Sequence, residues 1–409
     1  MHRIRPFLLI ASAAVLCCAG RPVLAADWPQ FNGPNRDCVS PETNINKEWR
    51  KQPPKELWRI SLGDHGYGGP CAARGKLFIV DHKENDDVLR AIDATIGKEA
   101  WSLSYPDPGP EQEYGFTRST PAYSDGKLYV LSRLGLLLCV DVEKGEKLWS
   151  KDIVADFQGR RPIYFYSHSP VVEGNHVIVC PCGPGANVVC LDKTNGNEVW
   201  RGGGDDAGGY CTPAVGKLAG KKQYVMFTGV SVIGVDAENG KLLWSHPWRT
   251  QFDLNIATPV INGETVFVSS DYNKGCALLN LAGGKPAVLW ENKLMQTHFN
   301  SPFFFDNAFF GNSGNATRPG DLVCLDSRTG NANWDQQGFE TGGLLYVDGT
   351  ILALNGRTGD LYMLKADNKQ FSILSRIKPL GGQSWTAPIL ADGKLYIRNR
   401  DALVCLNLK

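Results

Sequence analysis

The stretch Asp93-Ala-Thr-Ile-Gly97-Lys-Glu-Ala-Trp101 carries the strongest structural signal in this chain, because its spacing returns along the sequence. Asp, three residues, Gly, three residues and Trp recur in five copies, and a sixth, degenerate copy ends at Trp290. The repeated Asp and closing Trp residues are Asp93, Trp101, Asp141, Trp149, Asp192, Trp200, Asp236, Trp244, Trp290, Asp326 and Trp334. Such a fixed period indicates a repeat architecture in which each copy is one structural unit.

Each unit has the chemistry of a short antiparallel sheet. The Asp carboxylate can accept backbone N–H bonds within a turn, and Gly supplies the positive φ that such turns often require. The Trp ring is large enough to pack between neighbouring sheets. A Ser/Thr-Pro signal such as Thr120-Pro121 precedes each copy, and alternating segments such as Lys127–Leu131 read as strands. Because one sheet cannot cover both of its faces, the units are expected to stack radially.

Counting the units predicts eight blades. Six end in Trp, and a seventh, Gly342–Leu374, has lost its Trp. The eighth starts at Thr386 and ends one strand short, whereas Lys55–Leu62 contains an unassigned strand with Trp58. Pairing that strand with the C-terminus closes the ring and leaves no open end. The sequence thus predicts an all-β, eight-bladed β-propeller of four-stranded antiparallel blades, closed by N- and C-terminal strands in one blade.

The N-terminus has the layout of an export signal. Residues 1–26 combine a basic start, an apolar run and a small-residue cleavage region. We therefore expect a signal peptide at 1–26, an N-terminal extension at 27–54 and the propeller at 55–409. No later stretch is long and apolar enough for a transmembrane segment, so a periplasmic or secreted location is expected. Four of the ten mature cysteines repeat at one position of separate units and read as buried apolar residues: Cys139, Cys190, Cys324 and Cys405.

The recurring unit resembles the pyrroloquinoline-quinone (PQQ) repeat, over about Leu57–Lys409. The hairpins Asp125–Tyr129 and Asp392–Tyr396 have the Asp-Gly-Lys-Leu-Tyr pattern of that family, and the leader Asp27–Arg36 resembles the opening of its exported bacterial members. The resemblance implies either a periplasmic quinoprotein dehydrogenase or a non-catalytic scaffold such as the propeller of outer-membrane protein assembly. A shared fold does not decide between these functions.

Dehydrogenases of this kind resemble one another in a vicinal disulfide, a set of calcium ligands and a catalytic Asp. The mature chain has no adjacent cysteine pair, since Cys180 and Cys182 are separated by Pro181. No segment matches the calcium ligands or the catalytic Asp, and no zinc-like ligand spacing occurs. We therefore expect no metal and no cofactor, with PQQ plus calcium as the alternative, and a non-catalytic protein is favoured.

Residues just before each innermost strand are expected at the mouth of a central funnel. They form two rows one position apart, and the sequence does not decide which row points inward. Arg offers a fork of donors for carboxylates and Trp a flat stacking face. The candidate ligand-binding residues are Tyr67, Arg118, His168, Tyr210, Asn300 and Trp385. The alternative reading is a ring of solvated polar loop residues.

The charge balance narrows the range of partners. Lys+Arg (43) nearly cancel Asp+Glu (42), which leaves no basic field for nucleic acid. We expect an exported, monomeric propeller that binds a protein or an envelope polymer through its funnel face. The alternatives are a PQQ-dependent dehydrogenase and a carbohydrate-binding or carbohydrate-active propeller, the latter using loop aromatics such as Tyr114 and Tyr164.

Overall fold

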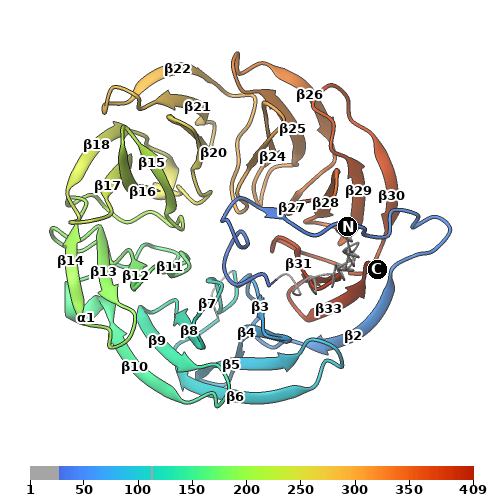
Figure 1. The fold of residues 1–409 in the computed structure, drawn as a ribbon, viewed down its shortest axis with the longest axis horizontal. Coiled ribbons are helices and arrows are strands. Elements are labelled where there is room, and N and C mark those ends of the chain that lie inside the picture. The colour runs from blue at the N-terminus through green and yellow to red at the C-terminus, as the bar shows by residue number, and fades with distance from the viewer. Residues whose placement is uncertain (1–26, 112–113) are drawn as a thin grey trace, which may run out of the picture.

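The computed structural model describes residues 27–111 and 114–409, so the predicted signal peptide at 1–26 lies outside the described residues. Eight antiparallel sheets are arranged as a ring around a central axis (Figure 1). The predicted eight-bladed, all-β architecture is therefore confirmed. The described residues include no helix with the length and apolar character that a bilayer crossing requires.

The first four blades follow one another along the chain, and each begins at its innermost strand. Blade 1 consists of β3 (Cys71–Ala73), β4 (Lys76–Lys83), β5 (Asp86–Asp93) and β6 (Glu99–Pro106). Blade 2 consists of β7 (Ala122–Ser124), β8 (Lys127–Leu131), β9 (Leu136–Asp141) and β10 (Lys147–Asp152), followed by α1 (Ile153–Phe157). Blade 3 consists of β11 (Val171–Glu173), β12 (His176–Val179), β13 (Val188–Asp192) and β14 (Glu198–Gly202). Blade 4 consists of β15 (Ala214–Leu218), β16 (Lys221–Phe227), β17 (Ser231–Asp236) and β18 (Leu242–Pro247), followed by the 3-10 helix η1 (Gln251–Asp253).

The second four blades complete the ring. Blade 5 consists of β19 (Val260–Asn262), β20 (Thr265–Ser270), β21 (Gly275–Asn280) and β22 (Ala287–Asn292). Blade 6 consists of β23 (Phe303–Phe305), β24 (Ala308–Ser313), β25 (Asp321–Asp326) and β26 (Ala332–Gln337). Blade 7 consists of β27 (Thr341–Val347), β28 (Thr350–Asn355), β29 (Leu361–Lys365) and β30 (Ile373–Ile377), with β1 (Val39–Ser40) added in parallel to β27. Blade 8 consists of β31 (Ile389–Ala391), β32 (Lys394–Arg398), β33 (Ala402–Asn407) and β2 (Lys55–Ser61).

Blade 8 closes the ring as the sequence predicts. The N-terminal strand β2 is antiparallel to the C-terminal strand β33, and Trp58 lies opposite Cys405. The Trp58 side chain is buried within the cluster that contains the inner strands of blades 7, 8 and 1. Pairing the two ends of the chain in one sheet removes the exposed edge that an incomplete eighth blade would leave.

The repeated Asp residues occupy the turns between the two outer strands of their blades. In the first copy, the Asp93 carboxylate accepts from the backbone N–H groups of Thr95 and Ile96 at 2.8 and 3.0 Å. Gly97 follows at a φ of 70°, and its N–H donates to the Asp93 carbonyl at 2.9 Å. The carboxylates of Asp141, Asp192, Asp236 and Asp326 make equivalent contacts. The predicted role of these residues in turns is confirmed.

The leader before the propeller crosses the centre of the ring, where Figure 1 shows it in blue. Trp28 exchanges backbone hydrogen bonds with Ala72 of blade 1, and the carbonyl of Pro29 accepts from Tyr123 of blade 2. Farther around the ring, the Asn32 amide donates to the Ser301 hydroxyl before blade 6 at 3.0 Å. The leader is thus held by blades on opposite sides of the axis.

The ten cysteines from Cys38 to Cys405 are all buried and unpaired. This group includes the four repeat cysteines, which lie within the sheets as the sequence predicts. Cys180 and Cys182 also remain reduced, and the thiol of Cys180 lies 3.5 Å from the sulfur of Met226. Burial raises the pKa of Cys182 to about 12, so this thiol stays protonated.

Candidate functional site

The loops between blades determine which residues reach the axis. In a four-stranded antiparallel blade that starts on the inside, every loop from the outermost strand to the next innermost strand opens on the same face of the ring. One row consists of Tyr67, Arg118, Ser167, Tyr210, Ile256, Phe299, Thr341 and Trp385, and all of its members except Thr341 line one central cavity. Of the alternative row, only Asn300 and Thr386 line it. The structure therefore selects one of the two rows between which the sequence could not choose.

The cavity has a volume of about 140 Å³ and lies between the loops and the leader. Several aromatic rings from the loops line the cavity, Tyr272 and His298 among them, and we call six of them the collar: Tyr67, Tyr114, Tyr164, Tyr210, Phe299 and Trp385. The opposite side of the cavity is formed by the leader residues Trp28, Phe31, Asn32 and Cys38. The cavity thus lies between the collar and the leader.

Trp385 is the centre of the collar. Its ring stacks on Tyr67 at a centroid distance of 4.8 Å and on Phe299 at 4.4 Å. Tyr114 lies 6.0 Å from Trp385 and 5.7 Å from Tyr164. Since Trp385 is only 7% exposed, it forms a fixed apolar wall for anything that enters the cavity.

Arg118 is the only charged side chain among the described residues that line the cavity. Its Nη2 donates to the carbonyl of Gly115 at 3.3 Å, while its Nε is buried without a hydrogen-bond partner among the described residues. Burial and repulsion from Arg133 lower the pKa of Arg118 to about 10, so the guanidinium remains charged at neutral pH. A cation without a nearby carboxylate gives the cavity a positive potential.

The remaining predicted residues fall into two groups. Asn300 lines the cavity and positions the collar, because its amide donates to the carbonyls of Thr341 and Trp385, both at 3.2 Å. His168 lies outside the lining residues. Its Nε2 accepts from the Cys180 N–H at 3.0 Å, and burial lowers its pKa to about 3. The structure thus places five of the six predicted residues at the cavity, and His168 in the surrounding core.

His298 is a lining residue that the candidate set did not include. It precedes β23 in blade 6, diametrically opposite the loop of Arg118 before blade 2. Its Nδ1 is buried without a hydrogen-bond partner among the residues that the structure describes. Because burial lowers the pKa of His298 to about 3, the ring is neutral. Its position two residues before Asn300 could have indicated that His298 lies near the funnel. The direction of its side chain, however, depends on how the loop folds.

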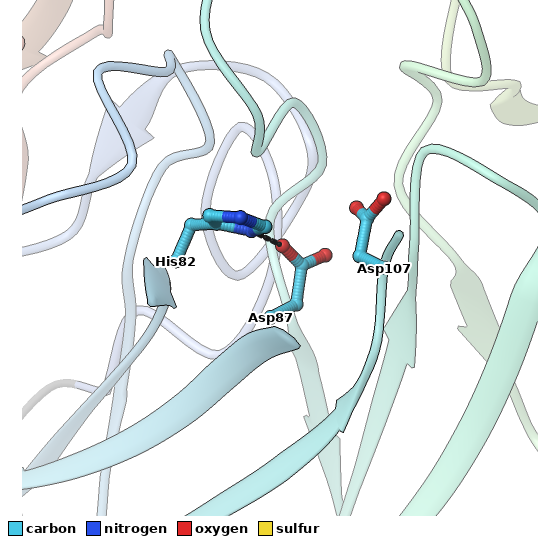
Figure 2. A group of neighbouring side chains, drawn as sticks. All are labelled: His82, Asp87 and Asp107. Carbon is cyan, nitrogen blue, oxygen red and sulfur yellow. Dashed lines mark hydrogen bonds and ion pairs between the residues drawn. The ribbon is translucent and has the colours of Figure 1, made fainter. Parts of the chain in front are cut away.

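A buried cluster of His82, Asp87 and Asp107 packs near the loop that carries Arg118. Figure 2 shows His82 hydrogen-bonded to Asp87, with Asp107 nearby. The ligand atoms of these three residues lie within 4.8 Å of one another, which is compatible with a metal site. However, Arg133 donates to both carboxylate oxygens of Asp107 at 3.0 Å. Both ring nitrogens of His82 are also engaged, by Asp87 and by the Glu84 carbonyl, each at 2.9 Å. The cluster is therefore built as a hydrogen-bonded ion network.

This network supports the loop that carries Tyr114 and Arg118. The ring of Phe116 stacks on His82 with an interplanar angle of 6°, and the Arg133 guanidinium lies 4.8 Å from the centre of the same ring. Next in the chain, the Thr117 hydroxyl donates to Asp64. Asp64 in turn pairs with Arg398 of blade 8 at 2.8 Å, with both side chains buried. Ion pairs on two sides thus hold the loop against blades 1 and 8.

The cavity does not match the cofactor of quinoprotein dehydrogenases. PQQ is a tricyclic tricarboxylate held beside a calcium ion, and calcium requires several oxygen ligands, usually including carboxylates. The described lining offers one cation, Arg118, and no Asp or Glu. The described lining therefore has too few cations for the three carboxylates of PQQ and no acidic ligand for calcium.

The fold and the site together define a propeller of PQQ-repeat type with a central cavity. The family model of the outer membrane protein assembly factor BamB matches residues 87–336, more than half of the chain, and the protein belongs to this family.

Individual relatives agree with this assignment. BamB of Yersinia pestis is 21% identical over 386 residues, covering 86% of this chain and 88% of the relative. The structure of BamB from Moraxella catarrhalis superimposes with a TM-score of 0.62 at 15% identity, covering 87% of this chain and 99% of the other. The quinohemoprotein alcohol dehydrogenase from Comamonas testosteroni gives a TM-score of 0.67 at 13% identity, covering 93% and 80%. The two structural likenesses, at such low identity, show the fold alone.

Proposed function

We propose that this protein is an exported, non-catalytic propeller that binds a protein partner of the bacterial envelope through the face that carries the collar. The export step rests on the signal-like sequence at 1–26. The envelope role is supported by relatives that are named as outer membrane protein assembly factors.

The observation that carries the proposal is a set of exposed apolar side chains on the collar-face loops. Ile163 is 71% exposed, Phe252 52% and Leu294 45%. They belong to the loops that enter blades 3, 5 and 6, the same class of loop that supplies the collar. Exposed apolar side chains also occur on outer strands, for example Leu148 on β10 and Val199 on β14. Those on the collar-face loops can contact a partner that covers the mouth of the ring. Ile163 and Leu294 are aliphatic and offer no flat ring for stacking on a sugar, so a protein is the better partner.

The chemistry of the cavity supports binding over catalysis. General acid–base catalysis needs titratable groups with pKa values near the working pH. The described lining contains no carboxylate, and burial holds the pKa of His298 at about 3. Arg118 stays charged at neutral pH. These groups can orient and hold a molecule, but they offer no proton donor or acceptor near neutrality.

The test is site-specific photo-crosslinking of the full exported chain in native envelopes. A photoreactive phenylalanine analogue at Ile163 or Phe252 probes the collar face, and the same analogue at Leu148 is the matched control. Leu148 is also an apolar exposed residue, at 47%, but it lies on the outer strand β10. We expect one defined protein adduct from both collar-face positions and none from Leu148. Identical adducts from all three positions, or polysaccharide adducts only, would contradict the proposal.

A further inference from the structure

The central cavity is bounded by the leader and by the loops of the collar face. Trp28, Phe31 and Asn32 of the leader line the cavity, and the leader bonds to blades on both sides of the axis. Among the loop residues that line the cavity, Tyr114 and Tyr164 are partly exposed. A folded protein or an extended polypeptide cannot thread such a pocket, so any molecule held there must be small.

The size of the pocket restricts the ligand to about one ring. Its volume is about 140 Å³, and protein cavities of roughly 150 Å³ are known to hold a molecule of the size of benzene. Trp385 is fixed by stacking on both of its faces and by the Asn300 amide on its carbonyl, so the collar cannot widen without breaking these contacts. The fused tricyclic frame of PQQ exceeds this space.

The polar groups of the pocket define the charge of the ligand. Arg118 is the one cation on the lining, and its buried Nε lacks a partner among the described residues. On the opposite blade, the buried Nδ1 of His298 also lacks one among those residues. Leaving a buried donor unpaired is costly, and burying an unpaired charge costs more. A carboxylate bound in the pocket would supply the missing partner of the Arg118 donor.

We propose that this pocket binds a small, flat monoanion, a single ring that bears one carboxylate, with the carboxylate on Arg118 and the ring among the aromatic side chains of the collar. Arg118 presents its fork to the carboxylate oxygens, a geometry that discriminates strongly for planar anions. This site goes beyond the partner-binding function, because it lies in the cavity on the axis, whereas the proposed partner contacts the exposed side chains of the loops. It also separates this chain from propellers that hold a tricarboxylate quinone.

The experiment is isothermal titration calorimetry of the mature chain with defined probes. Benzoate carries the predicted ring and charge, benzamide is its neutral isostere, and acetate has the charge without the ring. We expect one benzoate site per chain, with benzamide and acetate each at least about tenfold weaker. PQQ with calcium is expected not to bind. Absence of benzoate binding at millimolar concentration, equal affinity for benzamide, or stoichiometric PQQ binding would each overturn the proposal.

Variants locate the site. Arg118→Gln is expected to weaken benzoate at least about tenfold and to leave the weak benzamide affinity unchanged. Arg328→Gln is the matched control, because it removes the same charge from an exposed turn of blade 6. Thermal unfolding of each variant verifies folding, and the comparison of benzoate with benzamide on the native chain remains decisive if Arg118→Gln does not fold. Unchanged benzoate affinity in folded Arg118→Gln refutes the site, while crosslinking at Ile163 tests the partner face separately.

Discussion

Trp58, in the strand that closes the last blade, lies directly against Gly97, the turn glycine of the first blade. A Cβ on Gly97 would stand 2.6 Å from Cγ of Trp58, and the indole Nε1 donates to the carbonyl of Ala94 at 3.2 Å. The same packing recurs between Trp101 and Gly145, Trp149 and Gly196, Trp200 and Gly240, and Trp290 and Gly330. The glycine of each of these turns therefore serves two blades at once.

This relationship predicts that Gly97→Ala is strongly destabilising. The substitution forces a side chain into positive φ, at a cost of about 1 kcal/mol, and adds a clash with Trp58 worth roughly 1–3 kcal/mol. Gly126→Ala is the matched control, because Gly126 has a φ of 78° but open space around its Cβ. Urea denaturation of both variants isolates the packing contribution. Equal losses of stability would show that Trp58 yields freely and that the contact between the blades is not specific.

The turn carboxylates predict a second, smaller effect. Replacing Asp326 by Ala removes the acceptor for the N–H groups of Arg328 and Thr329, and we expect a loss of about 1 kcal/mol in the free energy of unfolding. Asp326→Asn keeps an acceptor oxygen and is expected to lose less. Neither variant should alter benzoate affinity. A variant that lost binding at unchanged stability would show that the repeated Asp has a role beyond its turn.

The repeat was predictable from sequence because its signals are local. The spacing from Asp93 to Trp101 lies within one turn and one strand, and the missing eighth Trp pointed to Trp58 for closure. The inward-facing row was not predictable, since a shift of one residue along an extended loop reverses the direction of every side chain. His168 illustrates this, because its side chain is buried in the core whereas those of Tyr67 and Arg118 reach the cavity.

The central pocket and the buried ion network were also beyond sequence reasoning. Both depend on contacts across long stretches of chain, such as Asn32 with Ser301 and Asp64 with Arg398. No short motif marks such pairs, because the ring brings together loops that are far apart in sequence. His82, Asp87 and Asp107 likewise converge only after the strands of blade 1 pair.

The same Arg→Gln substitution is predicted to affect stability differently at Arg133, which is buried, and at Arg118, which is partly exposed. Arg133→Gln leaves the buried Asp107 carboxylate without its cation, and we expect a loss of about 3–5 kcal/mol. Arg118→Gln removes a cation that has no carboxylate partner among the described residues, and stability should stay within about 1 kcal/mol of the native chain. Chemical denaturation measures both. A large loss for Arg118→Gln would mean that the residue is structural and would weaken its assignment to ligand binding.

The ion network behind the collar predicts a specific pH dependence. Burial raises the pKa of Asp87 to about 7, and a hydrogen bond from His82, which lowers this pKa, offsets only part of the effect of burial. Burial lowers the pKa of His82, but its hydrogen bonds to Asp87 and the Glu84 carbonyl outweigh burial, and the pKa is raised. Asp107, Arg133 and Tyr105 complete the groups that face this pair. Both shifts mean that the folded state holds protons more tightly than the unfolded chain.

The sign of the effect follows from proton linkage. An unfolded Asp releases its proton near pH 4, whereas folded Asp87 keeps it until about pH 7, so the free energy of unfolding falls as the pH rises through this window. Asp87→Asn mimics the protonated carboxyl, and its stability should fall less over the same range, by on the order of 2 kcal/mol. Denaturation curves at pH 4.5 and 7.5 provide the measurement, and Asp401→Asn, at a 76% exposed side chain, is the control. If native chain and Asp87→Asn lost stability in parallel, Asp87 would not be the group that titrates behind the Arg118 loop.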